Sequence, residues 1–319
     1  MKIHIISTVN GIQNEGMRNV ATHISKYFEK DNQVVYSSLR DLLKIPLRCK
    51  TSDVTLIFAR CVGKVYTIAR LCQMFTKNLN ICIVQQPDKE FVSKNNKHPL
   101  KCDYFTICKE DADVLKLAQG YSVKKFDAGI NTTKFCPADD EKRKAVRNKY
   151  NISSDKPLVL HVGHCSKGRG LEDFIKIDSD KFEKLIIASG MFENAETVAA
   201  LHGANVRVLS EYIENINELY QAADVYLFPT RSGEFVISVP LSVMEALACG
   251  TPAVAYKSFS KMSAISTTTD DAITFIDSDD EINSAIFKAA ALKSCKSLLK
   301  EPRSWEDVAE QILEQLNLR

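Results

Sequence analysis

The stretch PLSVMEALACGTPAVAY at residues 240–256 predicts a loop, a short helix and a buried strand. Pro240 suits the entry to a helix, because its fixed φ and missing amide hydrogen fit the first helical positions. Gly250 is a helix-stop residue, and Pro252 forbids continuation. Amides at such a helix start bind anions, and Glu245 on the first turns is placed to hold the two vicinal hydroxyls of a ribose. The stretch therefore indicates a nucleotide-diphosphate site, and the alternative is an amphipathic helix on which Glu245 is only solvated.

Strands and helices alternate along the rest of the chain. Apolar runs predict two series of strands, at 3–8, 33–36, 54–58, 81–84, 104–107 and 123–126, and then at 158–162, 184–188, 206–209, 225–228, 253–256 and 273–275. Helical patterns lie between many of them, at 17–28, 64–75, 110–118, 141–150 and 196–201, and another helix is expected to begin at 171. Two series of β-α-β units predict an α/β protein with two Rossmann-like parallel-sheet domains. Ligands are then expected at the carboxyl ends of the strands, in a central cleft between the domains.

Composition is that of an ordinary soluble protein, with 319 residues of which 45% are hydrophobic and 26% charged. No apolar run approaches the roughly 20 residues that span a bilayer, and residues 1–7 predict a first strand rather than a signal peptide. The ten cysteines are scattered and form no Cys-x-x-Cys pair. Reduced, buried thiols of a cytoplasmic protein are expected rather than a zinc site. The six histidines show no ligand spacing, so no metal is predicted.

Charge is distributed unevenly. Up to Pro137 the chain holds 21 basic and 12 acidic residues, and beyond it 21 and 28, so the two parts carry +9 and −7. A basic first half indicates an anionic partner, either a membrane surface or a lipid-diphosphate acceptor. We therefore expect peripheral contact at the inner face of a membrane, and the alternative is a solvated lysine-rich surface. Nucleic acid is disfavoured, because the net charge is only +2 and no basic-aromatic cluster occurs.

Residues 241–254 resemble the nucleotide-sugar signature of glycosyltransferase family 4, which has the GT-B fold. In that signature an acid, seven residues and a second acid precede Ala-Met-Ala-Cys-Gly-Thr-Pro. Glu245 occupies the place of the second acid, to which the resemblance assigns the ribose hydroxyls. Ile237 stands where the first acid is expected. Glu234, three positions earlier, is the candidate replacement and requires the loop at 232–239 to bulge.

Further segments resemble the same family, closely over 120–256 and weakly over 1–119. They are a hinge at 128–137, a strand and glycine turn at 158–171, a segment at 218–229 and a Ser-Trp helix start at 304–305. The resemblance makes Arg169 the clamp of the donor diphosphate, beside Gly163 and Lys167. His164 replaces a family arginine, so its contribution as a cation is expected only below about pH 6.5.

Two candidate site residues lie in the N-terminal half. Gly16 follows the first strand and could allow close approach of a phosphate to a helix start; the family has Gly-Gly where this chain has Glu15-Gly16, and the alternative is an ordinary β-α turn. After the strand at 81–84 the family usually places a histidine. This chain has QQPD at 85–88. Asp88 is the candidate catalytic group there, and a Pro-Asp turn is the alternative.

The predicted chemistry follows from the leaving group. A departing nucleotide diphosphate needs cations and dipoles on its oxygens. Arg169, Lys167 and the amides near Pro240, Leu241 and Ser242 are expected to supply them without a metal. The Asp-x-Asp triplets at 178–180 and 277–279 are interpreted as polar turns.

The resemblance implies a retaining, metal-independent glycosyltransferase of polysaccharide biosynthesis. It would move a sugar from a UDP- or GDP-sugar to a glycan or lipid-linked acceptor and need no cofactor beyond this donor. Residues 1–135 would form the acceptor domain, with 303–319 packing back on it, and 136–302 the donor domain. Two alternatives remain, a phosphorylase-like enzyme and a non-catalytic sugar- or nucleotide-binding subunit on the same fold. The absent first acid, the Gln85-Gln86 pair and His164 favour the second.

Overall fold

The chain forms two compact units in a computed structural model that describes residues 1–7, 16–188 and 194–316. Unit 1 comprises 1–129, 236–239 and 303–319, and unit 2 comprises 130–235 and 240–302. Residues 8–15, which make up most of the predicted loop before Gly16, lie outside the described ranges. Within those ranges, no helix has the length and apolar character needed to cross a membrane.

The sheet of unit 1 is parallel throughout, in the order β2-β1-β3-β4-β5-β6. Its strands are β1 (Lys2–Ile6), β2 (Gln33–Ser37), β3 (Val54–Phe58), β4 (Leu79–Ile83), β5 (Asp103–Thr106) and β6 (Val123–Lys125). The central strands are buried along their whole length. A strand covered by helices on both faces needs a continuous apolar run, which is the pattern these segments have.

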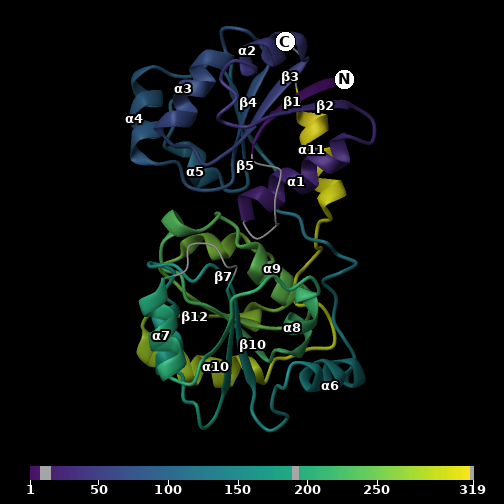
Figure 1. Ribbon diagram of the computed structural model, residues 1–319, viewed down its shortest axis with the longest axis vertical. Helices are drawn as coiled ribbons and strands as arrows, with labels where there is room; N and C mark the ends of the chain where they lie inside the picture. The colour runs from purple at the N-terminus through teal and green to yellow at the C-terminus, as the bar shows by residue number, and fades with distance from the viewer. Residues whose placement is uncertain (8–15, 189–193, 317–319) are drawn as a thin grey trace. The chain divides into compact units, whose positions relative to one another are not determined.

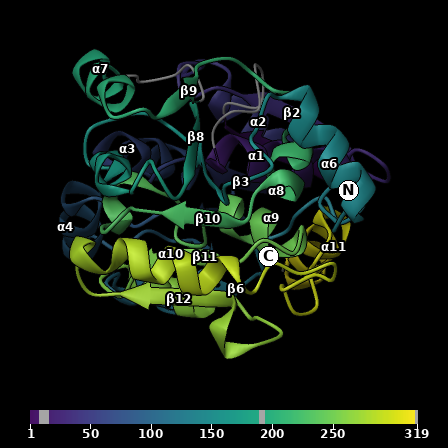
Figure 2. The same cartoon turned by 90° about the horizontal axis from the view of Figure 1, so that it is seen from below.

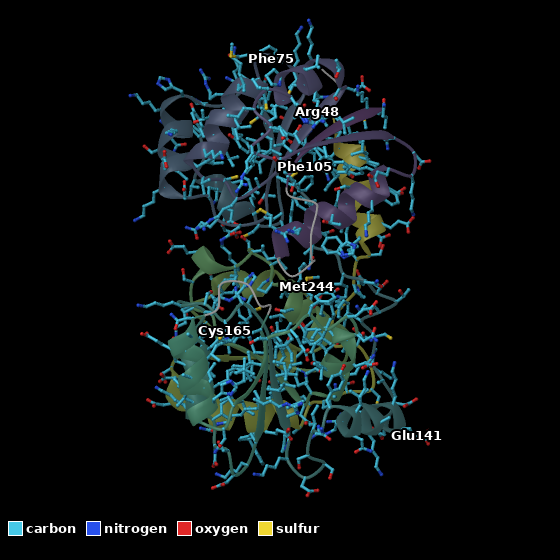
Figure 3. The ribbon with its side chains drawn as sticks, in the orientation of Figure 1. Arg48, Phe75, Phe105, Glu141, Cys165 and Met244 are labelled. Atoms are coloured by element: carbon cyan, nitrogen blue, oxygen red, sulfur yellow. The ribbon has the colours of Figure 1, made fainter. Side chains whose placement is uncertain are left out.

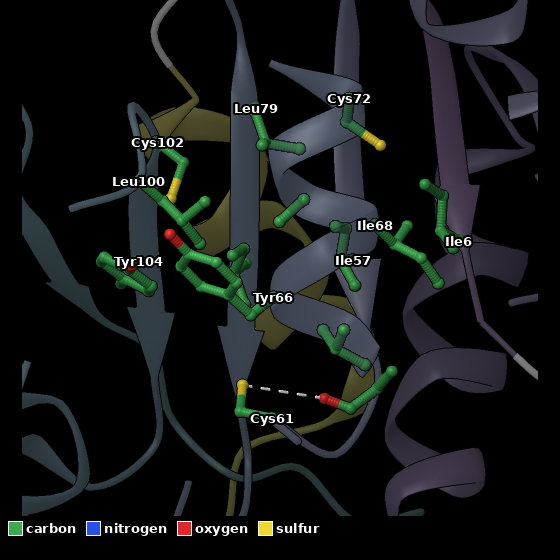
Figure 4. Packing of buried hydrophobic residues seen from close by; sticks show 14 of the residues in the cluster. Ile6, Ile57, Cys61, Tyr66, Ile68, Cys72, Leu79, Leu100, Cys102 and Tyr104 are labelled. Atoms are coloured by element: carbon green, nitrogen blue, oxygen red, sulfur yellow. Dashed lines mark hydrogen bonds between the residues drawn. The ribbon is translucent and has the colours of Figure 1, made fainter. Parts of the chain in front are cut away.

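Helices cover both faces of this sheet. They are α1 (Gly16–Phe28), α2 (Ile45–Thr51), α3 (Gly63–Cys72), α4 (Lys89–Lys97), α5 (Lys109–Asp113) and α11 (Trp305–Gln315). Residues of α2, α3, α4 and α5 share one core cluster with the strands, in which cysteines pack as small apolar side chains (Figure 4). The right-handed rule for parallel crossovers places α1 on the opposite face, because its strands progress in the other direction.

The C-terminal helix belongs to unit 1 and packs against α1 (Figure 1). A capping box begins α11, with the Ser304 hydroxyl and the Asp307 carboxylate each accepting from the other's backbone amide. The Trp305 ring stacks on His23 with 5.1 Å between centroids. A Cβ on Gly129 would lie 2.8 Å from that indole, so only glycine fits beneath it.

The sheet of unit 2 is also parallel, in the order β12-β11-β10-β7-β8-β9. Its strands are β7 (Leu158–Gly163), β8 (Glu183–Ala188), β9 (Arg207–Leu209), β10 (Val225–Phe228), β11 (Ala253–Tyr256) and β12 (Ile273–Ile276). The chain runs outward from β7 to β9 and then returns to the other side of β7 to form β10. This reversal creates a topological switch point between β7 and β10, where open α/β sheets bind ligands.

Helices and short 3₁₀ turns complete unit 2. They are α6 (Asp140–Lys149), α7 (Ala195–Gly203), α8 (Ile216–Ala222), α9 (Leu241–Ala248), α10 (Ile282–Ala290), η1 (Leu171–Lys176), η2 (Gly233–Phe235), η3 (Ser260–Ala264), η4 (Asp270–Ala272) and η5 (Asp279–Glu281). Helix α10 lies along β11 and β12 (Figure 2) and packs with η1, which also contacts α7. Helices α6, α8 and α9 form a separate packed series, and α9 lies against β10 and β11.

These elements confirm the predicted α/β architecture with two parallel sheets. Several helix predictions were wrong in detail. The helix expected over 64–75 ends at Cys72, and the one expected over 110–118 is the short α5. Helices α2, α4 and α10 were not predicted. In α4 only Phe91 and Asn95 are buried, so the nine-residue helix has almost no apolar period to detect.

Candidate functional site

Gly163 and Arg169 lie together at the switch point of unit 2. Gly163 ends β7, and a Cβ built on it would lie 2.8 Å from Arg169 Nη2 and 2.9 Å from His161 Nε2. The absence of a side chain at Gly163 therefore lets the guanidinium approach the backbone. Arg169 is only 7% exposed, and burial lowers the pKa of its guanidinium. A buried guanidinium at the carboxyl end of a strand is well suited to bind a phosphate group.

The loops that follow β7 and β10 interlock and hold Arg169 in place. Thr230 Oγ1 donates a hydrogen bond of 3.2 Å to the Arg169 carbonyl. Gly170 adopts a left-handed φ of 74°, and a Cβ there would lie 2.3 Å from the Pro229 carbonyl oxygen. Only glycine combines this backbone conformation with such close packing. The last glycine of the Lys-Gly-Arg-Gly sequence is therefore required for steric reasons.

His161, which the sequence pattern does not single out, also lies at the site. Its Nδ1 lies 3.0 Å from the Leu227 carbonyl, so it is the protonated nitrogen and the lone pair is on Nε2. The ring stacks on Tyr226 at 5.9 Å. Burial, and then the charge of Arg169, lower the pKa of His161 to about 3. A neutral imidazole with its acceptor nitrogen near the guanidinium adds no positive charge beside Arg169.

Helix α9 carries the second half of the site. Pro240 is its N-cap residue, and the first amides of the helix have no partner within the helix. Glu245 is half-buried on the second turn, and its Oε2 accepts a hydrogen bond of 3.0 Å from the Tyr220 hydroxyl. Burial raises the pKa of Glu245 to about 7, while the Tyr220 hydroxyl and the charge of Lys134 act in the opposite direction.

Tyr226 connects the two halves of the site. Its hydroxyl donates to the Val162 carbonyl at 3.1 Å, next to Gly163, and its ring packs against that of Tyr220 with 5.8 Å between centroids. Burial raises its pKa to about 12, so it remains a neutral phenol at physiological pH. The charge of Arg169 lowers the pKa of this hydroxyl, and the charge of Glu245 raises it. Tyr226 therefore links the end of β7, beside Gly163 and Arg169, to Tyr220 and Glu245.

The other predicted residues of unit 2 are more exposed. Lys167 is exposed in the loop after β7, and His164 is half-buried there. Leu241 is buried and begins α9. Glu234 is exposed in η2, where its amide donates to the Ser232 hydroxyl at 3.2 Å.

The two predicted residues of unit 1 have structural roles. Asp88 is the N-cap of α4, and its carboxylate accepts from the Phe91 amide at 2.7 Å. Gly16 begins α1, and a Cβ on it would lie 3.0 Å from the side chain of Ile237. The residue in the place of the family's first acid therefore packs within unit 1 against Gly16. The segment around it is held there by hydrogen bonds from Ser238 to the Val84 carbonyl and the Asp111 carboxylate.

Tyr220, Tyr226 and Lys134 were not identified as site residues from the sequence. The tyrosines lie in the segment 218–229, where the pattern indicates ordinary core residues, because nothing local shows that their hydroxyls contact Glu245 and the Val162 carbonyl. Lys134 lies in the hinge-like segment 128–137 and donates to the Glu214 carbonyl at 2.5 Å. Within the described ranges, no three His, Cys, Asp or Glu side chains gather as metal ligands.

A match to a known protein family covers most of unit 2. Residues 156–291 match the family described as "Glycosyl transferases group 1". A Corynebacterium glutamicum protein named GDP-mannose-dependent monoacylated alpha-(1-6)-phosphatidylinositol monomannoside mannosyltransferase is 26% identical over 170 residues, which are 46% of this chain and 44% of that protein. A Campylobacter jejuni protein named N,N'-diacetylbacillosaminyl-diphospho-undecaprenol alpha-1,3-N-acetylgalactosaminyltransferase is 30% identical over 128 residues, 38% of this chain and 32% of that protein. The chain thus spans less than half the length of these relatives.

Solved structures match the whole fold. HepE of Anabaena, in complex with UDP and glucose, superposes with a TM-score of 0.78 at 13% identity, over 99% of each chain. WaaG, a glycosyltransferase involved in lipopolysaccharide biosynthesis, gives a TM-score of 0.67 at 13% identity, over 99% of this chain and 96% of that one. At such identities the likeness concerns the fold. Residues 156–291 thus resemble the group 1 glycosyltransferases, and the chain as a whole has the two-domain GT-B fold.

Proposed function

We propose that this chain is a glycosyltransferase that moves a sugar from a nucleoside-diphosphate donor to an acceptor hydroxyl. The observation that carries the proposal is a continuous set of contacts from Arg169 to Glu245. Arg169 packs on Gly163, the Tyr226 hydroxyl donates to the neighbouring Val162 carbonyl, and the Tyr226 ring contacts Tyr220, which donates to Glu245. Arg169 would bind the diphosphate, and Glu245 would accept hydrogen bonds from the ribose hydroxyls. The match of residues 156–291 to the family supports this assignment.

In the reaction, the bond between the anomeric carbon and the diphosphate oxygen breaks, and its electron pair stays on the leaving diphosphate. The acceptor oxygen bonds to that carbon and loses its proton. Arg169, with Lys167 and the α9 amides at Leu241 and Ser242, would stabilise the charge that develops on the diphosphate. His161, held neutral, would leave the guanidinium free of a competing cation. Retention of configuration and independence of metal remain part of the proposal, on the family resemblance.

A lipid-linked acceptor is the acceptor class we favour. Matched relatives are named for phosphatidylinositol mannoside, diacylglycerol glycoside and diphospho-undecaprenol substrates. The basic N-terminal half, at +9, complements such anionic lipids. We propose that the protein works at the cytoplasmic side of a membrane.

Calorimetry with UDP, GDP, uridine and guanosine tests the donor assignment. We expect one diphosphate to bind well above its nucleoside, and Arg169→Ala to remove that difference. Lys300→Ala, at an exposed lysine of unit 2, is the matched control and should leave binding unchanged. If neither diphosphate binds better than its nucleoside, the donor site is wrongly assigned.

A non-catalytic binding subunit is the second candidate. Ile237 favours it, because an apolar residue packed on Gly16 cannot contact a donor sugar as an acid would. Incubation with UDP- and GDP-sugars, with membrane lipid as acceptor, separates the two. Tight nucleotide binding with no nucleoside diphosphate released from any donor would favour the binding subunit over the enzyme.

A further inference from the structure

An ion pair joins the loop after β10 to η1, which begins two residues beyond Arg169. Arg231 Nη2 lies 3.0 Å from Asp173 Oδ1. The Asp173 side chain is 6% exposed, so the acidic half of the pair lies in the interior of unit 2. Burial raises the pKa of Asp173, and hydrogen bonds from Arg231 and Tyr256 oppose that rise. The carboxylate therefore depends on these two partners, because a buried charge that is left unpaired is strongly destabilising.

Tyr256, the last residue of β11, completes a cluster of three side chains. Its hydroxyl donates to Asp173 Oδ2 at 2.8 Å and accepts from Arg231 Nη2 at 2.7 Å. The guanidinium also covers the tyrosine ring, with Cζ 3.8 Å from the ring centroid. We call Asp173, Arg231 and Tyr256 the η1 cluster. It joins the segments that follow β7 and β10 to the end of β11, at the edge of the sheet where α/β proteins bind ligands.

The η1 cluster contacts the Arg169 loop at Gly170. A Cβ on Gly170 would lie 3.0 Å from Arg231 Nη1, so the guanidinium packs against the backbone directly after Arg169. The Asp173 amide donates to the Gly170 carbonyl at 3.1 Å. The Arg169 carbonyl accepts from the hydroxyl of Thr230, the residue before Arg231. The backbone on both sides of the Arg169–Gly170 peptide is therefore held by the cluster and the loop that carries Arg231.

We propose that Arg231 is a positioning residue, which acts through the η1 cluster to hold Arg169 at the donor diphosphate. The inference rests on the proposed function of Arg169. A guanidinium binds phosphate oxygens in a defined fork geometry, so a shift of the backbone at Gly170 would misplace the Arg169 side chain. Arg231 itself is engaged elsewhere, because its Nη2 donates to Asp173 and Tyr256 and one face of its guanidinium covers the tyrosine ring.

The second half of the site is held separately. In Figure 3, Cys165 marks the loop that carries Arg169, and Met244 marks α9, which carries Glu245. Glu245 accepts from Tyr220 and has no printed contact with the η1 cluster in the described ranges. Loss of the cluster is therefore expected to affect the diphosphate and not the nucleoside.

Calorimetry of the full chain tests the proposal, with UDP and GDP as probes and uridine and guanosine as the matching nucleosides. Arg231→Gln should weaken binding of the preferred diphosphate about tenfold, the order of one broken contact in a hydrogen-bonded network, and leave nucleoside binding unchanged. Asp173→Asn removes the ion pair from its other partner and should give the same loss. A merely structural role would lower the melting temperature of these variants without changing the ratio of the two affinities.

The double variant Arg169→Ala with Arg231→Gln separates positioning from direct contact. If Arg231 acts through Arg169, the double variant should bind diphosphate as weakly as Arg169→Ala alone. Losses that add would mean that Arg231 contacts phosphate itself, and they would overturn the proposal.

Lys176→Gln is the matched control, because it breaks an exposed ion pair of η1 with Asp279 and leaves the η1 cluster intact. It should melt and bind as wild type, since an exposed pair contributes little. An equal loss in Lys176→Gln, or full diphosphate affinity in folded Arg231→Gln, would overturn this inference alone when Arg169→Ala still removes the diphosphate preference. A wild-type protein that binds diphosphate no better than nucleoside would instead refute the donor site, and this inference with it.

Discussion

Replacing Glu245 with glutamine should make the nucleotide-free protein more stable and the nucleotide complex weaker. The glutamine keeps an oxygen that can accept the Tyr220 hydroxyl, which lies 3.0 Å from Glu245 Oε2. It removes a carboxylate that burial holds at a pKa of about 7, against 4.5 for an ordinary glutamate. The same desolvation that costs stability in the free protein leaves the carboxylate ready to accept ribose hydroxyls.

The magnitude follows from proton linkage. Below about pH 4.5 the carboxyl group is protonated in both the folded and the unfolded chain, so it contributes nothing. Between pH 4.5 and 7 the folded chain binds more protons, and stability falls as pH rises. A pKa of about 7 in the folded chain, against 4.5 in the unfolded chain, corresponds to at most about 3 kcal/mol above pH 7, less what water at the exposed edge of the side chain screens. Glu245→Gln should therefore gain up to about 3 kcal/mol at pH 8 and nearly nothing at pH 4.5.

Urea unfolding at the two pH values measures this gain, and calorimetry measures the binding loss. One lost charge-assisted hydrogen bond should weaken UDP or GDP binding by about 1.5–3 kcal/mol, roughly 10- to 150-fold. Glu281→Gln, at an exposed acid of η5, is the control and should change neither quantity. A gain that is the same at both pH values would refute the buried-charge reasoning. Unchanged nucleotide affinity in the folded variant would remove Glu245 from the site.

Three further predictions concern the diphosphate clamp and the C-terminal helix. Arg169→Ala should cost UDP or GDP about 1.5–3 kcal/mol in binding and the bare nucleoside almost nothing; equal losses in calorimetry would mean that Arg169 does not contact phosphate. Gly163→Ala should lower the free energy of unfolding by about 1–3 kcal/mol through overpacking. It should also weaken diphosphate binding, because its Cβ would lie 2.8 Å from Arg169 Nη2. Gly203→Ala, whose Cβ meets nothing within 4 Å, is the control in both assays. Trp305→Ala should raise the pKa of His23 from about 4 toward 6.5, because the indole that stacks on the imidazole contributes to its burial; an imidazole titration by NMR that stays near 4 would contradict this packing.

The helix over residues 241–248 was predictable because its signals are local. Pro240 caps it, and Gly250 ends it with a left-handed φ of 72°. The strands were predictable for a similar reason, since a strand buried on both faces needs an unbroken apolar run. Helix α2 escaped prediction because exposed Leu47 within it, and exposed Leu42 and Leu43 just before it, conceal the period of its buried face.

Local patterns in the chain were enough to predict the two-domain α/β architecture and to place Arg169 on a loop and Glu245 on a helix. The environment of both residues depends on tertiary packing. The Tyr226 hydroxyl meets the Val162 carbonyl because β10 pairs with β7, a strand about sixty residues earlier, and that pairing depends on long-range packing. The segment 236–239 joins unit 1 for the same kind of reason, through contacts of Ile237 and Ser238 with residues far away in sequence. Local periodicity encodes which face of an element is buried, but it does not encode which distant element covers that face.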